Sequence, residues 1–153
     1  MKAKKLLATL GMAAMFMCLP QQVSANNSLE LKNVNGTIVL YENGKTATDK
    51  SGFVEVDGIT VFVSNGTVLN VNGLFQDPKN VSDWYYLAEG RVQTQHTGLV
   101  LYDGAWFYVE NGKLDTTTAG FVPYDGSLFY VGLGRIMTEV SGLAQDPNGS
   151  DWY

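Results

Sequence analysis

Aromatic residues recur at every second position of short apolar stretches, and their side chains are the best suited to binding chemistry in this sequence. Trp84 is followed two residues later by Tyr86, and Trp106 by Tyr108, while Tyr130 stands at the corresponding place further on. Residues two apart in a β-strand lie on the same face of the sheet. Rings arranged in this way can stack on a sugar or hold a cation, with each cation–π contact contributing roughly 0.5 to 2 kcal/mol. The same rings could instead serve packing between neighbouring hairpins, since each ring buries about 150–250 Å².

The acidic residues suggest one alternative, a calcium loop, which the spacing does not favour. Asp77 and Asp83 recur as Asp146 and Asp151 in two insertions of similar sequence. A calcium site needs about six to eight oxygen ligands, whereas Asp77-Pro78 is typical of a turn. The sequence therefore predicts neither a metal nor another cofactor.

No set of residues forms a catalytic motif. His96 is the single histidine, and the polar stretch around it indicates an exposed linker residue. Asp103, Glu110 and Asp125 occupy repeated turn positions, where acidic residues are favoured for backbone reasons, rather than the paired positions of a glycosidase cleft. The sequence predicts that the protein is not an enzyme.

The N-terminal segment, 1–25, has the pattern of a signal peptide. A lysine-rich head is followed by an apolar run over positions 6–19 and by Val23-Ser24-Ala25, which resembles a cleavage site. The apolar run is shorter than the roughly 20 residues that span a bilayer, and no second one follows. Cys18 is the only cysteine and lies within this segment, so the mature chain has no thiol chemistry. We expect a secreted protein that begins at Asn26 and does not insert into a membrane after cleavage.

The charge balance limits the possible partners. Seven basic and fifteen acidic residues follow Ala25, which gives a net charge of −8. Nucleic acid and anionic membrane surfaces attract basic patches, so both are disfavoured as partners. A sugar polymer or a cationic ligand remains compatible with this charge.

Recurring glycine starts divide the chain into repeats of about 22 residues, a period that is typical of a solenoid or array. The units begin at Gly52, Gly73, Gly98, Gly120 and Gly142. The spacing between these starts is nearly constant and is longest between Gly73 and Gly98.

Two turn signals within each unit predict its local structure. Asp103-Gly104 and Asn111-Gly112 are typical of type I′ hairpin turns, in which both central residues need positive φ. Because a lone hairpin is marginal in water, each unit must bury its apolar face against its neighbours. The predicted fold is all-β, a solenoid of stacked β-hairpin repeats preceded by a signal peptide. Such a rod would present one aromatic cluster per repeat along a ridge.

The two ends of the array differ from its middle. Residues 26–51 contain a degenerate first repeat, recognised by Gly36 and by the stretch 42–45. Residues 52–153 contain the clearer repeats, and the last copy, 142–153, mirrors residues 73–85 but stops in mid-strand. Since a solenoid usually ends in a polar cap, we expect the last repeat to be truncated and the chain to be a fragment of a longer protein.

Period-two alternation sorts the second strand of each unit into two faces. The uniformly apolar face is predicted to be core and carries Val39, Val61, Tyr85, Phe107 and Phe129 with Tyr41, Val63, Leu87, Val109 and Val131. The opposite face is predicted to be half-exposed and carries Ile38, Thr60, Trp84, Trp106, Leu128 and Trp152 with Leu40, Phe62, Tyr86, Tyr108 and Tyr130.

These repeats resemble the cell-wall-binding repeat superfamily, which includes the choline-binding repeats of Gram-positive surface proteins, glucan-binding repeats and the short repeats of clostridial toxins. The resemblance rests on a glycine-plus-apolar start, on an aromatic strand such as Trp106-Phe107-Tyr108-Val109, and on a second glycine turn. It covers residues 52–153, and residues 30–51 more weakly. It implies a β-hairpin solenoid and a cell-surface, carbohydrate-binding role.

The resemblance also implies where a ligand would bind. In choline-binding members the ligand lies between successive hairpins, between the tryptophan of a Gly-Trp start and two aromatics of the strand. Leucine replaces that tryptophan here at Leu74, Leu99 and Leu143. By this comparison only Trp106 and Tyr108, with Phe121 of the next unit, keep three rings, which makes choline a doubtful ligand.

The function predicted from the sequence is that of a secreted, non-catalytic module, associated with the cell wall, that binds cell-envelope or extracellular polysaccharide. The predicted ligand-binding residues are Trp84, Tyr86, Trp106, Tyr108, Phe121 and Tyr130. The alternative is a structural or adhesin-like spacer, in which the rings only hold the repeats together.

Overall fold

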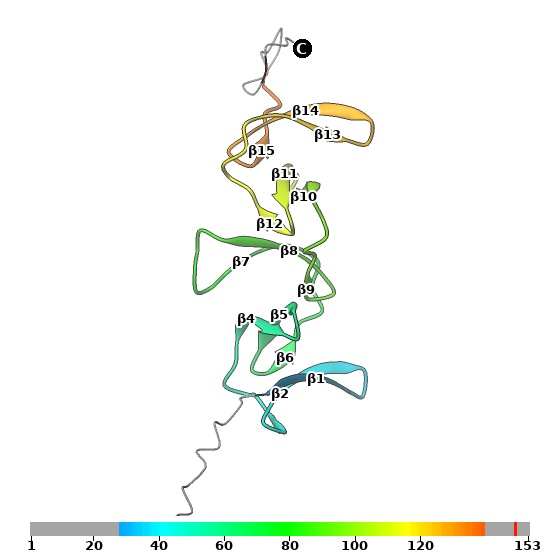
Figure 1. Ribbon diagram of the computed structural model, residues 1–153, viewed down its shortest axis with the longest axis vertical. Coiled ribbons are helices and arrows are strands. Elements are labelled where there is room, and N and C mark those ends of the chain that lie inside the picture. Colours follow the sequence, from blue (N-terminus) through cyan, green and yellow to red (C-terminus); the bar gives the residue numbers. More distant parts are fainter. Residues whose placement is uncertain (1–27, 140–148, 150–153) are drawn as a thin grey trace, which may run out of the picture.

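The chain forms an elongated stack of β-hairpins, shown by a computed structural model that describes residues 28–139 and 149 (Figure 1). All regular structure in these residues is β-strand, in one antiparallel sheet of 15 strands. The strands are β1 (Leu29–Val34), β2 (Thr37–Glu42), β3 (Lys45–Thr46), β4 (Gly52–Val56), β5 (Ile59–Ser64), β6 (Thr67–Val68), β7 (Gly73–Gln76), β8 (Trp84–Ala88), β9 (Arg91–Val92), β10 (Gly98–Tyr102), β11 (Ala105–Glu110), β12 (Lys113–Leu114), β13 (Gly120–Tyr124), β14 (Ser127–Gly132) and β15 (Arg135–Ile136). The predicted all-β fold of stacked hairpin repeats is confirmed.

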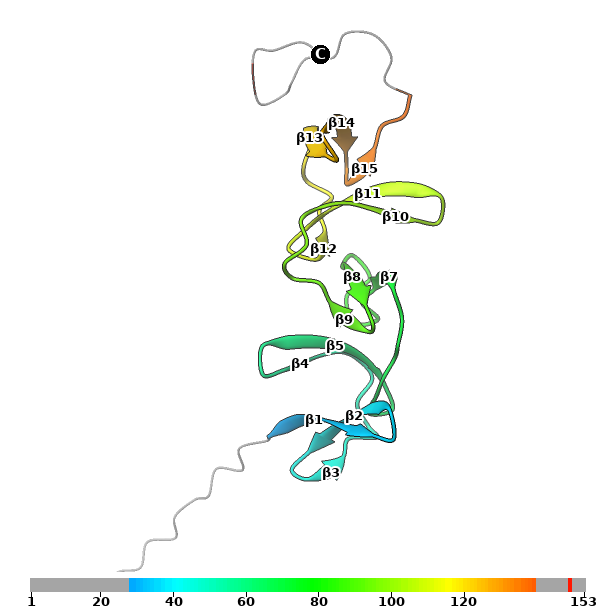
Figure 2. The ribbon, with the colours of Figure 1, turned by 90° about the vertical axis from the view of Figure 1, so that its right-hand side faces the viewer.

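Successive hairpins point in different directions around the long axis of the stack. The β7–β8 hairpin and the β13–β14 hairpin extend to opposite sides in Figure 1, while β4–β5 and β10–β11 extend to opposite sides in Figure 2. The aromatic strands therefore wind around the rod, so the predicted ridge of aromatic clusters does not lie on one side of it.

Three strands form each unit, which we number one to five from β1–β3 to β13–β15. The first two strands form the hairpin, and the third is a two-residue strand that pairs with the second strand of its own unit. From the second unit onward, this third strand also pairs with the second strand of the preceding unit, as in the partners Val61 and Arg91 or Phe107 and Arg135. These pairings make the units one continuous sheet.

The predicted type I′ turns are present. Asp103 and Gly104 have φ values of 47° and 74°, and Asn111 and Gly112 have values of 51° and 76°. Two other turns place a residue ill-suited to positive φ at the first central position, Glu89 at 51° and Leu133 at 49°. The repeat geometry imposes the turn at these two places without the usual side chain.

Glycine at the second turn of a unit fits closely against the unit before it. The N–H of Gly112 donates to the carbonyl of His96 at 2.8 Å, and its carbonyl accepts from the N–H of Tyr86 at 2.8 Å. A Cβ on Gly112 would lie 2.6 Å from the carbonyl oxygen of Gln93, whereas a Cβ on Gly104, in the first turn, would meet nothing within 4 Å. The second turn is therefore a junction between units, and the first turn is only a hairpin end.

Small hydrophobic clusters between successive units form the core. The predicted core face is confirmed at five positions, where Val61, Val63, Leu87, Val109 and Val131 are at most 1% exposed. Val39, Tyr85, Phe107 and Phe129, which were assigned to the same face, are half-buried. The opposite face is half-buried or exposed from the second unit onward, as predicted.

The first unit departs from the predicted pattern. Leu40, assigned to the half-exposed face, is fully buried against Ala47 and Val56, and Tyr41, assigned to the core, is half-buried. The physical reason lies in the neighbours: the second unit covers the face of Leu40, while Tyr41 has the Nζ of Lys32 over its ring at 4.6 Å from the centroid.

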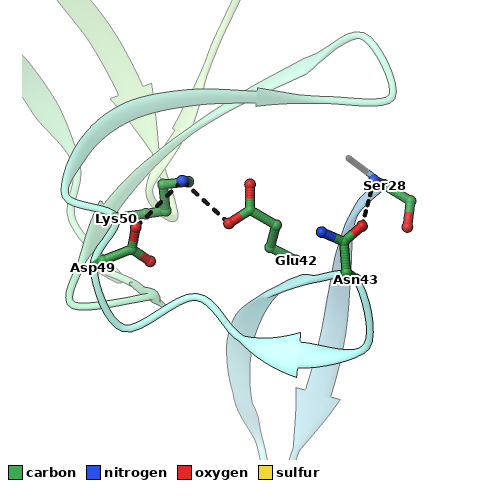
Figure 3. A network of polar contacts seen from close by, with 5 residues as sticks. All are labelled: Ser28, Glu42, Asn43, Asp49 and Lys50. Carbon is green, nitrogen blue, oxygen red and sulfur yellow. Dashed lines mark hydrogen bonds and ion pairs between the residues drawn. The ribbon is translucent and has the colours of Figure 1, made fainter. Parts of the chain in front are cut away.

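Polar contacts fix the end of the first unit (Figure 3). The Nζ of Lys50 lies 3.2 Å from an oxygen of Glu42 and 3.4 Å from an oxygen of Asp49. The hydrogen bonds to Glu42 and then Asp49 raise the pKa of Lys50 above its usual 10.5. The N–H of Ser28 donates to Oδ1 of Asn43 at 3.3 Å, which ties the start of β1 to the turn after β2.

Several predictions fall outside the described residues. They are the signal peptide over residues 1–25 and, in the last copy, Leu143, Asp146, Asp151 and Trp152. Residues 28–139 contain no helix of the length and apolarity that a membrane span requires.

Candidate functional site

Aromatic and aliphatic side chains of the third and fourth units enclose an apolar cavity of about 250 Å³, which we call the ring cavity. Its lining residues are Leu74, Trp84, Tyr102, Phe107 and Leu114. The two hairpins supply the rings: Trp84 opens β8, Tyr102 closes β10, and Phe107 lies in β11.

The rings of the cavity are steeply inclined to one another. The centroids of Trp84 and Tyr102 are 6.0 Å apart with the ring planes at 63°, and those of Tyr102 and Phe107 are 6.4 Å apart at 62°. Tyr102 is opposite Ala105 in the hairpin register, and this small residue leaves its ring free to reach Trp84 of the preceding unit. We call Trp84, Tyr102 and Phe107 the first ring triad.

A second ring triad repeats this arrangement one unit further along. Trp106 lies 5.6 Å from Tyr124 with the planes at 54°, and Tyr124 lies 6.3 Å from Phe129 at 65°. The residues equivalent to Trp84 and Trp106 are Ile38 in the first unit and Thr60 in the second. Among the described units, only the last two junctions therefore carry this triad.

The six predicted site residues are divided among several places. Trp84 lines the ring cavity and Trp106 belongs to the second triad, while Tyr86 contacts the ring of His96 at 4.9 Å. Phe121 contacts Tyr130 across its own hairpin at 5.1 Å.

Tyr108 is half-buried against the cluster of Leu99, Val122 and Val131. Burial raises the pKa of its hydroxyl, and the negative charges of Glu110 and Asp115 raise it further. The ring of Tyr108 thus contributes to the packing between the fourth and fifth units.

The sequence analysis missed four members of the ring triads, since it assigned Phe107 and Phe129 to the core face and did not single out Tyr102 and Tyr124. The two tyrosines each stand directly before an Asp-Gly turn, and the Tyr-Asp-Gly triplet occurs at the same place in the fourth and fifth units, as 102–104 and 124–126. This recurrence was the available signal. Five of the six predicted site residues rest on the alternation of the second strand, which does not include the first strand, whereas Phe121 in β13 rests on the family resemblance.

The prediction of an exposed His96 is wrong. Its ring is half-buried against Tyr86, and its Nε2 is buried with no hydrogen-bond partner in the described part of the chain. The reason is the junction described above, in which the second turn of the fourth unit covers the tail of the third and Gly112 donates to the His96 carbonyl.

The acidic residues of the insertion have structural partners. Asp77 accepts the N–H of Lys79 at 2.8 Å, which confirms the predicted turn, and Asp83 lies 2.8 Å from the Nζ of Lys113. Within residues 28–139 and 149, no three His, Cys, Asp or Glu side chains are grouped so that they could hold a metal ion.

Comparison with known families finds a match in the fourth unit. Residues 97–115, which span β10, β11 and β12, match the family model of the choline-binding repeat. The resemblance to cell-wall-binding repeats is confirmed. The matched segment supplies Tyr102, Phe107 and Leu114 to the ring cavity, so three of the five lining residues come from it.

Solved structures of choline-binding proteins are similar to the chain at low sequence identity. CbpJ from Streptococcus pneumoniae TIGR4 is 19% identical, with a TM-score of 0.43 over 80% of this chain and 38% of that protein. Choline binding protein F from Streptococcus pneumoniae is 22% identical, with a TM-score of 0.44 over 81% of this chain and 40% of that protein. The chain thus spans 38–40% of the length of these structures. No curated protein matches it in sequence.

Proposed function

We propose that the protein is a secreted, non-catalytic module of the cell surface that binds a cell-envelope polysaccharide through choline groups attached to the polymer. The ring cavity carries this proposal, with the trimethylammonium head of choline as its occupant. The match of residues 97–115 to the choline-binding repeat supports it.

The inclination of the rings favours a compact, rounded group over a flat sugar. Planes at 63° and 62° cannot lie together on one face of a pyranose, but they can surround a sphere-like head group. Aromatic faces attract a quaternary ammonium by roughly 0.5 to 2 kcal/mol per wall. Tyr102 supplies a third ring at the site of Trp84, where the sequence comparison offered only Leu99 of the next unit in place of a tryptophan.

The apolar lining of the ring cavity also favours a trimethylammonium group over a sugar. Two leucines and three aromatic rings line it, so a sugar inside would leave most of its hydroxyls without partners, which is costly. A trimethylammonium group has no hydrogen-bond donor and needs no acceptor. The net charge of −8 after Ala25 also favours a cation.

The second triad makes binding to a polymer stronger than binding to free choline. Two weak sites on one rod can engage two choline groups of the same chain, and the second contact is then intramolecular. We expect high retention on a choline-bearing polymer together with weak affinity for the free head group.

Calorimetric titration of the protein with free choline tests the proposal. Tyr102→Leu keeps an apolar side chain in the cavity but removes one π face, so we expect its affinity to fall by about 2- to 30-fold, the equivalent of one cage wall. Tyr41→Leu, in the first unit, is the matched control and should bind as the wild type does. Equal affinity in both variants would contradict a site at the ring cavity.

A structural spacer is the second candidate, and the burial of the rings favours it. Trp84 and Tyr86 pack against the cluster of Leu74, Val100 and Val109. In a spacer these rings only hold units together, so Trp84→Ala would lower stability and there would be no choline binding to lose. The same calorimetric titration therefore separates the two candidates.

A further inference from the structure

A second cavity, larger and more polar than the ring cavity, lies where the first three units meet. Its volume is about 460 Å³, within the range of small-ligand sites. Its lining residues are Gly36, Thr37 and Ile38 of the first unit, Val68 and Asn70 of the second, and Glu89 and Arg91 of the third. We call it the polar hollow.

The polar hollow combines an apolar floor with a polar rim. Val68 is 9% exposed and Ile38 is half-buried, so these two side chains form the floor. The exposed side chains of Thr37, Asn70 and Arg91 lie around it, together with Glu89. This division suits a ligand with one apolar face and a periphery of hydrogen-bonding groups.

The rim side chains have no partners of their own. Neither the guanidinium of Arg91 nor the carboxylate of Glu89 forms an ion pair or a hydrogen bond within residues 28–139. Lys113 occupies the position equivalent to Arg91 in the following unit. Lys113 pairs with Tyr85 in the sheet, just as Arg91 pairs with Val61. Lys113 is engaged, however, because its Nζ lies 2.8 Å from Asp83.

The backbone at Glu89 supports a role for its side chain. Glu89 has a φ of 51°, a conformation that asparagine tolerates better, and Asn43, Asn65 and Asn111 occupy the same turn position in three other units. A disfavoured residue at positive φ, with its side chain lining a cavity, is the kind of backbone outlier that accompanies function. Asparagine at this position would relieve the strain of the positive φ, but its side chain would be shorter than that of Glu89, which lines the hollow.

We infer that the polar hollow binds a neutral saccharide. The charges of Glu89 and Arg91 cancel, so neither a cation nor an anion is favoured. Guanidinium, carboxylate and amide groups are planar and offer paired donors or acceptors, which match adjacent hydroxyls of a sugar. The floor of Ile38 and Val68 fits the C–H face of a pyranose ring. This site is separate from the ring cavity and does not depend on choline binding.

Titration of the full chain with three neutral trisaccharides, followed by the backbone amide signals in NMR, tests the inference. The probes are chitotriose, maltotriose and cellotriose. We expect at least one to shift the amides of Thr37 and Asn70. Glu89→Asn should weaken that binding at least tenfold while it raises the melting temperature, and Arg91→Ala should weaken it to a similar degree.

Leu133→Asn is the matched control, since it relieves the strain of the same positive φ at a turn outside the hollow. It should also melt at a higher temperature, but it should bind the trisaccharide as the wild type does. The inference is overturned if no trisaccharide binds, if the shifts fall on Trp84 and Tyr102 instead, or if Glu89→Asn and Arg91→Ala leave the affinity unchanged. Free choline titrated in parallel reports on the ring cavity, so failure at one site is distinguishable from failure at the other.

Discussion

Substitution of alanine for glycine at the two kinds of turn gives a quantitative test of how the units are joined. Gly104 and Gly112 have nearly equal φ values of 74° and 76°. Each alanine therefore costs about 1–2 kcal/mol for the left-handed backbone conformation. For Gly104→Ala this is the whole expected loss, because the new Cβ meets nothing within 4 Å.

Gly112→Ala carries an additional cost, because its Cβ would lie 2.6 Å from the carbonyl oxygen of Gln93. Relief of this clash by movement of the turn would cost about 1–3 kcal/mol as overpacking. It would also weaken the hydrogen bonds to His96 and Tyr86, each worth about 1 kcal/mol. If about half of the energy of these two hydrogen bonds is lost, we expect a total loss of about 3–6 kcal/mol, which is about 2–4 kcal/mol more than for Gly104→Ala.

Urea unfolding followed by circular dichroism measures both losses. Gly44→Ala is a further control, since Gly44 is in a second turn but has no residue within 4 Å of its Cβ position. It should behave like Gly104→Ala. The account of the junction is refuted if Gly112→Ala and Gly104→Ala destabilise the protein equally.

Three further predictions concern stability, pH and binding. Leu133→Asn should raise the free energy of unfolding by about 0.5–1 kcal/mol in thermal melts, since leucine at a φ of 49° is strained and its side chain is 82% exposed. Burial alone would raise the pKa of Asp115, but hydrogen bonds from Thr117 and Thr118 outweigh it and lower the pKa from 3.8 to about 2. The carboxylate therefore stabilises the fold above about pH 4, and this contribution should disappear between about pH 4 and pH 2 in acid titrations of the wild type but not of Asp115→Asn. Trp106→Ala should weaken retention on a choline-bearing polymer while the circular dichroism spectrum stays near that of the wild type, because Trp106 is 37% exposed; unfolding of this variant would argue for a spacer.

The fold could be predicted from the sequence because the residues that determine each hairpin are close together in the chain. Asp103-Gly104 and Asn111-Gly112 set positive φ at both central residues whatever their surroundings, and the alternation of the strand between them assigns its two faces. Leu133 does not itself favour a positive φ, so the turn at this residue is recognised only from its position in the repeat. Leu40 was misassigned because its burial depends on Ala47 and Val56, which a strand pattern does not contain.

The site could be predicted only in part because it depends on the rotation between successive hairpins. The sequence correctly singles out Trp84 and Trp106 as rings on an accessible face, but it does not say which ring of the next unit they meet. In the structure they meet Tyr102 and Tyr124, which end the first strands. His96 shows the same limit, because its burial comes from the turn of the following unit.

Retention of the protein on insoluble cell wall, with and without choline substitution of the wall, tests the central claim most directly. The account predicts that the choline-substituted wall retains the protein, that free choline releases it, and that the unsubstituted wall does not hold it. Equal retention on both walls, unaffected by free choline, would contradict binding through the ring triads.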